Sequence, residues 1–340
     1  IMTIGAMMRA QANYAEGIFR NDQLVNMSPP LSVMWEASGD YLKDADLREP
    51  KAQIQTIPFS PGHLDEVPDS ALAVTWLGHS TMLIRIDGQT ILADPIFGPR
   101  ASMFGFMGPK RFDYSQTHKV SDLPQIDAVV ISHDHYDHLD YPTMKQLKDI
   151  VPHFYVPLGV GAHLEAWGIS PEKITEAVWW DEFAMNDSFK LAFTPTQHFS
   201  GRGLTDRNAT LWGSWAIMGK NKRVYFSGDS GYFPGFKEIG EKYGPFDLAM
   251  MECGAYSKYW ADIHMMPEES SMAGQDVRAD VVIPIHWGKF NLSIHPWKEP
   301  VQRILVQANQ SGQIIATPQP GELMLVGKDL PQTKWWEDYD

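Results

Sequence analysis

The pattern of apolar and polar positions predicts mainly short β-strands from residue 71 onward. Short apolar runs rich in β-branched residues are bounded by Gly, Pro, Asn or Asp, which is typical of strands separated by turns. Asp87-Gly88 lies between two such runs and predicts a hairpin turn. The predicted strands cover residues 71–77, 81–86, 90–93, 126–132, 153–156, 188–194, 210–218, 223–227, 246–251, 281–285 and 323–326.

Helical spacing of apolar residues appears between the later strands. One of these segments has Pro142 in its predicted first turn, a position that favours proline. Early hairpins followed by alternating helices and strands predict an α/β or α+β fold of sheets covered by helices. The predicted helices cover residues 142–150, 160–167, 235–243, 267–277 and 298–310.

The first 70 residues have an irregular composition. Leu31, Met34 and Trp35 fall near helical spacing, so we predict an amphipathic helix over 30–43. It either packs on the main body or serves as a lid or membrane-facing element. We divide the chain into an N-terminal extension packed on the core (1–70), a catalytic domain (71–330) and a C-terminal tail (331–340).

Composition narrows the function classes. The chain has 340 residues, 44% of them hydrophobic, which is enough for a large core. Its net charge of −14 argues against a nucleic-acid groove, so we expect no nucleic-acid partner. Cys253 is the one cysteine, which rules out an internal disulfide. The chain starts at Ile1, which indicates trimming, and the compartment stays open: soluble or peripheral to a membrane, cytoplasmic or periplasmic.

A loop rich in Gly, Phe, Met and Pro is predicted between residues 97 and 111. It contains Met103, Phe104, Phe106 and Met107. If these side chains are exposed, they form an apolar patch that needs a functional explanation. If they are buried, they are ordinary packing, and the sequence leaves both interpretations open.

The densest chemistry lies in the segment from Ser132 to Leu139. It contains three imidazoles and two carboxylates in His133-Asp134-His135-Tyr136-Asp137-His138. Neutral imidazole and carboxylate are the usual protein ligands of zinc and related metals. The segment follows the apolar run at 126–131, so it lies on a loop at the end of a predicted strand. The sequence therefore predicts a metal site at that strand end.

Three further strand ends carry the same kind of residue. His198 follows the strand at 188–194, Asp229 follows the one at 223–227, and His286 follows an apolar run that ends at Ile285. Each repeats the order of apolar strand, His or Asp, and nearby small residue. If these strand ends converge on one edge of a sheet, seven ligands divide into two metal sites that share one carboxylate.

The central segment matches the HxHxDH signature of the metallo-β-lactamase fold. His198, Asp229 and His286 stand where the later ligand motifs of that superfamily fall. More narrowly, the chain resembles N-acylphosphatidylethanolamine-hydrolysing phospholipase D and its bacterial relatives in residues 93–97, 107–112, 132–141, 211–215, 244–248 and 285–288. Residues 76–80, Trp-Leu-Gly-His-Ser, also resemble the related sugar-phosphate lactonase branch.

This resemblance implies a four-layer αβ/βα sandwich with two mixed sheets and helices outside. It also implies two divalent metal ions, with zinc expected and iron or manganese as alternatives. Such a pair acidifies a shared water, and the resulting hydroxide attacks the substrate. One ion would be held by His133, His135 and His198, the other by Asp137, His138 and His286, with Asp229 bridging them.

Further roles follow from the same resemblance. His264 matches a histidine near the substrate and is assigned to catalysis as a phosphate or oxyanion contact. Asp137, one of the expected metal ligands, is also assigned to catalysis. Asp94 is expected to support the metal ligands. His79 either contacts substrate or, as we favour, donates a supporting hydrogen bond. Tyr136 and Trp287 are expected to be pocket walls.

The leading functional hypothesis is a metal-dependent hydrolase that cleaves a lipid-like phosphodiester, as a phospholipase D does. One alternative is a lactonase or other ester hydrolase on the same metals. Another is a non-enzymatic metal-binding protein. A small-molecule or lipid substrate and peripheral membrane contact are expected partners. The oligomeric state stays open, with a dimer among the options.

Overall fold

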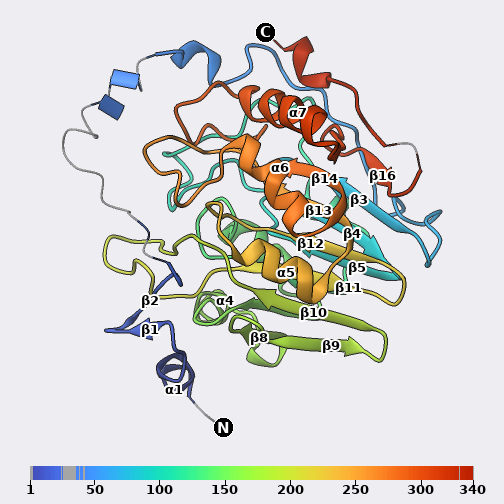
Figure 1. The fold of residues 1–340 in the computed structure, drawn as a ribbon. Coiled ribbons are helices and arrows are strands. Elements are labelled where there is room, and N and C mark those ends of the chain that lie inside the picture. The colour runs from blue at the N-terminus through green and yellow to red at the C-terminus, as the bar shows by residue number, and fades with distance from the viewer. Residues whose placement is uncertain are drawn as a thin grey trace.

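Two seven-stranded sheets pack face to face in this computed structural model, and helices cover their outer faces (Figure 1). This architecture confirms the predicted α/β sandwich with two mixed sheets. The structure describes residues 3–23, 25, 36–37, 39–40, 43–328 and 330–339. The helix predicted over 30–43 lies for the most part outside the described residues.

The first sheet is antiparallel from β16 to β5 and parallel from β5 to β8. Its predicted hairpin turn is present, with φ of +45° at Asp87 and +80° at Gly88, values typical of two-residue hairpins. In spatial order the strands are β16 (Leu323–Leu325), β3 (Leu72–Trp76), β4 (Met82–Ile86), β5 (Gln89–Ala93), β6 (Ala128–Val130), β7 (Phe154–Pro157) and β8 (Ile174–Ala177).

The second sheet mirrors this arrangement. It is parallel from β15 to β12 and antiparallel from β12 to β9. In spatial order the strands are β15 (Ile314–Ile315), β14 (Ala279–Ile285), β13 (Phe246–Glu252), β12 (Arg223–Phe226), β11 (Ser214–Met218), β10 (Phe189–Thr194) and β9 (Glu182–Asn186).

The core lies in three layers. Val74 and Ile84 of the first sheet pack with Trp215 and Ile217 of the second in the layer between the sheets. The outer face of the first sheet packs on one set of helices and that of the second sheet on another. These helices are α3 (Tyr141–Leu147) and α4 (Gly161–Ala166) on the first sheet, and α5 (Gly235–Tyr243), α6 (Pro267–Asp276) and α7 (Glu299–Ser311) on the second.

A tryptophan cluster closes one end of the layer between the sheets. Trp287 stacks on Trp76 at 5.3 Å between ring centroids and on Trp335 at 5.4 Å. Trp297 and Trp336 complete the cluster, at 6.5 and 5.8 Å from Trp287. Trp335 and Trp336 lie in a C-terminal 3-10 turn, so the end of the described chain packs behind the residue that follows His286.

Several boundaries differ from the predictions for local reasons. The strand predicted at 210–218 starts only at Ser214, because the N–H of Gly213 donates to the carbonyl of Ser132 instead of to the sheet. The helix predicted at 142–150 ends at Leu147. Within the two large sheets, the pattern missed β8, β9 and β15. Strand β9 alternates between exposed and half-buried residues at the sheet edge, where packing gives little apolar signal.

The described N-terminal residues are folded onto the body. They form α1 (Ile4–Arg9) and a small hairpin of β1 (Tyr14–Ala15) and β2 (Ile18–Phe19). Phe19 is fully buried in the layer between the sheets. The division of the chain at residue 70 stays a prediction. Among the described helices, none combines the length and apolar character that a bilayer crossing needs.

Candidate metal centre

The candidate ligands lie on loops that follow strand ends. Strands β5 and β6 are parallel neighbours, as are β12, β13 and β14, so the loops after them meet at common edges. Three of the residues have left-handed backbone conformations, with φ of +56° at His79, +38° at Asp94 and +67° at His286. Such conformations are uncommon for residues other than glycine and concentrate at functional sites.

The first group comprises His133, His135, His198 and Asp229, whose candidate ligand atoms all lie within 4.8 Å of one another. His135 Nδ1 is 2.8 Å from His133 Nε2 and 3.3 Å from His198 Nε2. The Asp229 Oδ2 atom lies 3.8 Å from His133 Nε2 and 3.7 Å from His198 Nε2. These are the four residues expected around one ion.

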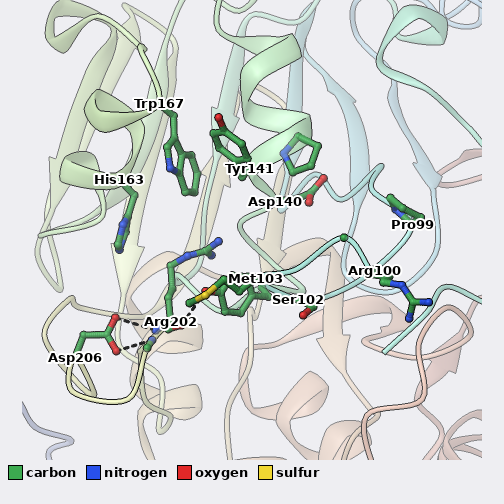
Figure 2. Close-up of a pocket in the computed structure, with 14 residues that line it drawn as sticks. Pro99, Arg100, Ser102, Met103, Asp140, Tyr141, His163, Trp167, Arg202 and Asp206 are labelled. Atoms are coloured by element: carbon green, nitrogen blue, oxygen red, sulfur yellow. Dashed lines mark hydrogen bonds between the residues drawn. The ribbon is translucent and has the colours of Figure 1, made fainter. Parts of the chain in front are cut away.

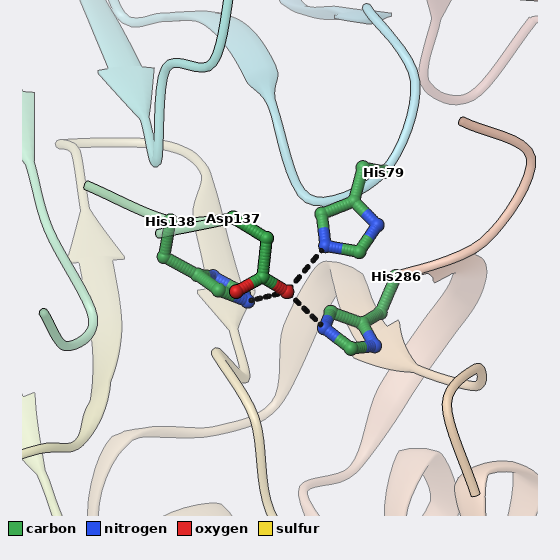
Figure 3. Close-up of side chains that lie close together, drawn as sticks. All are labelled: His79, Asp137, His138 and His286. Carbon is green, nitrogen blue, oxygen red and sulfur yellow. Dashed lines mark hydrogen bonds and ion pairs between the residues drawn. The ribbon is translucent and has the colours of Figure 1, made fainter. Parts of the chain in front are cut away.

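The second group comprises His79, Asp137, His138 and His286 (Figure 3). Asp137 Oδ2 is its centre, at 2.9 Å from His79 Nε2, 3.2 Å from His286 Nε2 and 3.4 Å from His138 Nε2. The structure thus brings His79 into the group itself. Its Nε2 atom is able to support the Asp137 carboxylate, as the sequence analysis favoured, and is also close enough to be a further ligand.

Asp229 connects the two groups. Its Oδ2 atom also lies 3.2 Å from His138 Nε2 and 3.0 Å from His286 Nε2. One carboxylate oxygen is therefore within 4 Å of four imidazoles, two from each group. This is the geometry that a bridging ligand requires.

The chemistry of these atoms fits bound cations. Asp229 Oδ1 is buried and has no hydrogen-bond partner in the structure. A buried polar atom without a partner costs about 1–3 kcal/mol, which a bound ion would offset. Burial lowers the pKa of His133 and of His198 well below its usual value, which leaves the neutral form that binds metal. Burial alone would raise the pKa of Asp229, but His138 and His286 hold it well below its usual range.

A buried carboxylate, Asp94, fixes the orientation of the candidate ligand His138. Asp94 is fully buried, and its Oδ2 accepts from His138 Nδ1 at 2.7 Å, while its Oδ1 accepts from the Ser132 N–H at 2.8 Å. Because Nδ1 of His138 is engaged, its Nε2 faces the group. Asp94 therefore lies where a supporting carboxylate is expected.

A carboxylate that the sequence analysis missed lies beside His264. Glu252, at the end of β13, is fully buried and hydrogen-bonds His264 Nδ1 through Oε1 and the Ser230 N–H through Oε2. The His264 ring is 5.0 Å from that of His198 and 5.4 Å from that of His286, so it borders both groups. In the sequence, Glu252 directly follows the strand predicted at 246–251 and stands two residues before Gly254, so this signal was available.

The two expected pocket walls differ from one another. Tyr136 lines a cavity of about 570 Å³ whose lining includes none of the candidate ligands (Figure 2). Its hydroxyl donates to the Arg202 carbonyl at 2.8 Å. Met103, Tyr141 and Trp167 supply apolar surface to the same cavity. The Trp287 side chain is instead buried in the tryptophan cluster, and its Nε1 donates to the Pro284 carbonyl. Trp287 therefore supports His286 from behind, because its ring faces the core.

Lys289 fixes two of the loops that carry these residues. Its Nζ is buried and donates to the carbonyls of Leu77, at 3.1 Å, and Ile96, at 2.7 Å. Leu77 precedes His79 by two residues, and Ile96 follows Asp94 by two. Burial lowers the pKa of Lys289 to about 7.

This lowered pKa predicts a pH dependence of stability. Between pH 7 and the unfolded value near 10.5, the unfolded chain holds a proton on Lys289 that the folded chain has lost. From pH 7 to 9, the unfolding free energy of the wild type should therefore rise by about 2 kcal/mol relative to that of Lys289→Met. Below about pH 6, the two curves of unfolding free energy against pH should be parallel. Urea unfolding in excess chelator measures the unfolding free energy of the wild type and of Lys289→Met. Lys237→Met, at an exposed position of α5, is the control for loss of a lysine elsewhere. Parallel curves up to pH 9.5 would contradict the prediction.

Comparison with known proteins agrees with this geometry. A family model described as "Beta-lactamase superfamily domain" matches residues 89–287. An uncharacterized protein of Mycobacterium tuberculosis is 40% identical over 349 aligned positions, which cover 98% of this chain and 90% of that protein. The N-acyl-phosphatidylethanolamine-hydrolyzing phospholipase D 1 of Caenorhabditis elegans is 41% identical over 233 positions, 65% of each chain.

The fold also matches solved structures. Igni18, a metallo hydrolase from Ignicoccus hospitalis, aligns with 76% of this chain and 100% of its own, at a TM-score of 0.58 and 21% identity. This likeness is one of fold alone. The chain spans less than two thirds of the Caenorhabditis elegans protein, so a shared substrate does not follow from the identity.

Proposed function

We propose a function that starts from the family of this chain. The chain belongs to the β-lactamase superfamily and is a metal-dependent hydrolase with the metallo-β-lactamase fold. On that premise, we propose that it cleaves a lipid-like phosphodiester in the manner of a phospholipase D. The observation that carries the proposal is the single Asp229 oxygen within reach of both histidine groups. It suits a pair of ions, which can stabilise both the attacking and the leaving oxygen when a phosphodiester is cleaved. The partial likeness to the Caenorhabditis elegans phospholipase supports the substrate class.

The residues that would hold the ions are those of the two groups. His133, His135 and His198 would hold one, and Asp137, His138 and His286 the other, with Asp229 between them. Bound divalent ions, zinc by preference with iron or manganese as alternatives, would polarise the phosphoryl oxygens and acidify a water. His79 is positioned to orient Asp137 or to join its group.

The remaining chemistry belongs to protein side chains. Hydrolysis forms a bond from a water oxygen to phosphorus and breaks the bond from phosphorus to the alcohol oxygen. The water gives up one proton and the departing alcohol takes up one, so the step balances. Although burial alone would raise the pKa of Asp137, His138, His286 and His79 hold it well below its usual value, which suits this carboxylate to hold an ion and not the proton. His264 donates from Nε2 to a phosphoryl oxygen, and Glu252 fixes the ring by holding Nδ1.

An exposed apolar loop supports a lipid substrate. Met103, Phe104, Phe106 and Met107 are 56%, 46%, 78% and 52% exposed, so the buried interpretation of this loop is wrong. Met103 also lines the cavity that contains Tyr136. We propose that the loop contacts a membrane surface or lipid aggregate and that the cavity receives an apolar part of the substrate.

This proposal predicts the effect of a loop substitution. Phe106→Ser should weaken association with phospholipid vesicles about tenfold, because roughly 1–2 kcal/mol of apolar burial is lost. Cleavage of a short, soluble diester should be unchanged. Val306→Ser, which removes another exposed apolar side chain on α7, is the matched control. Equal vesicle binding by Phe106→Ser and wild type, measured by flotation, would remove the loop from the proposal.

The substrate assignment is tested with a panel. The zinc-loaded chain is incubated with N-acylphosphatidylethanolamine, other lipid diesters, lactones and carboxylic esters, with and without chelator. Chelator-sensitive release of an alcohol or N-acylethanolamine from a diester is the expected result. Ring opening of lactones without diester cleavage would favour the lactonase alternative. Residues 76–80, which include His79, resemble the sugar-phosphate lactonase branch. Bound metal without turnover of any substrate would favour a non-enzymatic role.

A further inference from the structure

The side-chain amide of Asn21 bonds both backbone groups of one candidate ligand, His198. Its Nδ2 donates to the His198 carbonyl at 2.8 Å, and its Oδ1 accepts from the His198 N–H at 3.0 Å. The two residues are 177 positions apart in the chain. His198 lies beyond the end of β10, where no sheet ladder pairs its backbone, and it is fully buried. The Asn21 amide therefore makes the two backbone hydrogen bonds that a neighbouring strand would otherwise make with His198.

The imidazole of His198 is fixed at its far nitrogen as well. Nδ1 donates to the Ile263 carbonyl at 2.9 Å, which directs Nε2 toward His135 and Asp229. Three hydrogen bonds thus determine where Nε2 lies. Two of the three come from the Asn21 amide.

Asn21 is itself held in place. Its Oδ1 also accepts from Trp212 Nε1 at 3.2 Å. Two residues earlier, the fully buried Phe19 donates its N–H to the Asn208 carbonyl at 2.8 Å. The amide is therefore oriented by packed parts of the molecule, and its contact with His198 is not that of a loose surface residue.

We propose that Asn21 is a positioning residue for His198, through which the N-terminal segment (residues 3–23) sets the metal affinity of the His133, His135 and His198 group. The inference rests on the proposed function only in taking this group to bind a divalent ion. Loss of the amide leaves the N–H and the carbonyl of His198 buried without partners, which disfavours the present backbone position. A displaced Nε2 then coordinates poorly, although every ligand side chain is still present.

The test compares Asn21→Ala with Asn13→Ala. Asn13 lies in the same segment, and its Nδ2 is buried without a hydrogen-bond partner, so its removal breaks no such bond. Zinc is titrated into the metal-free full chain in competition with a chromophoric chelator, and the cobalt(II) absorption spectrum reports ligand geometry. We expect Asn21→Ala to weaken one of the two zinc sites about 10–100-fold and to alter the cobalt spectrum, as changes behind a ligand do. Asn13→Ala should match the wild type in both.

The outcomes separate this inference from the proposed function. Unchanged zinc affinities and cobalt spectrum in Asn21→Ala would overturn the positioning role, even if the wild type cleaves lipid diesters. A weakened site in Asn21→Ala, in a protein whose wild type cleaves no diester, would support the positioning role and overturn the substrate. If Asn21→Ala does not fold, Asn21→Asp, which keeps the acceptor and loses the donor, is judged by the same affinity criterion.

Discussion

Replacing Asp229 with alanine is expected to remove tight binding of both ions and to lower kcat/KM by at least about 10³-fold. Removal of a single electrostatic contact in an active site costs about 10²–10³-fold, and this carboxylate serves two groups. Its Oδ2 atom lies 3.0–3.8 Å from His286, His138, His198 and His133. Without it, the two groups lose the carboxylate oxygen that reaches both of them, and a water cannot supply the missing charge.

The measurement is the number of ions per chain by elemental analysis, taken together with hydrolysis of an activated diester. Asp187→Ala, at the exposed turn between β9 and β10, controls for loss of a carboxylate elsewhere. Far-ultraviolet circular dichroism establishes that both variants are folded. Two ions at full occupancy in Asp229→Ala would refute the bridging assignment.

Replacing His264 with alanine is expected to lower kcat about 10²–10³-fold while both ions stay bound. His264 lies beside both groups but is not required to hold either of them, since each group has four other candidate ligands. KM should change little if the contact forms mainly as charge develops on the phosphoryl oxygens. The ion content therefore separates this variant from Asp229→Ala.

Glu252→Gln tests the same contact from the other side. The glutamine keeps the shape of the side chain but removes the charged acceptor of His264 Nδ1, so kcat should fall less, by about tenfold. His153→Ala, which removes a histidine that bonds Thr175 on the first sheet, is the control. Equal loss of ions and of activity in His264→Ala would mean that His264 is itself a ligand.

The sequence predicted the main strands and the candidate ligands for one physical reason. Both signals are local: an apolar run predicts a buried strand, and His133, Asp229 or His286 just after such a run marks its end. The edge strand β9 was missed because an edge position needs little apolar surface. Glu252, which follows the strand predicted at 246–251, was missed because its partner His264 lies 12 residues further along the chain.

Tertiary relations were the part that could not be predicted. The contact of Asn21 with His198 spans 177 residues and depends on how the N-terminal hairpin packs. The approach of His79 to Asp137 depends on the order of the strands within the first sheet. Neither relation leaves a periodic trace in the sequence, so only the assembled fold reveals it.

The tryptophan cluster gives the metal centre an optical reporter of its own. Its indoles lie 5.3–6.5 Å from Trp287, a range in which aromatic chromophores exchange excitation energy. Trp287 adjoins His286 in the chain, so a displacement of His286 is expected to disturb the ring that contacts the other indoles of the cluster. Fluorescence and near-ultraviolet circular dichroism of the unlabelled protein therefore sense changes at this ligand, with no probe attached.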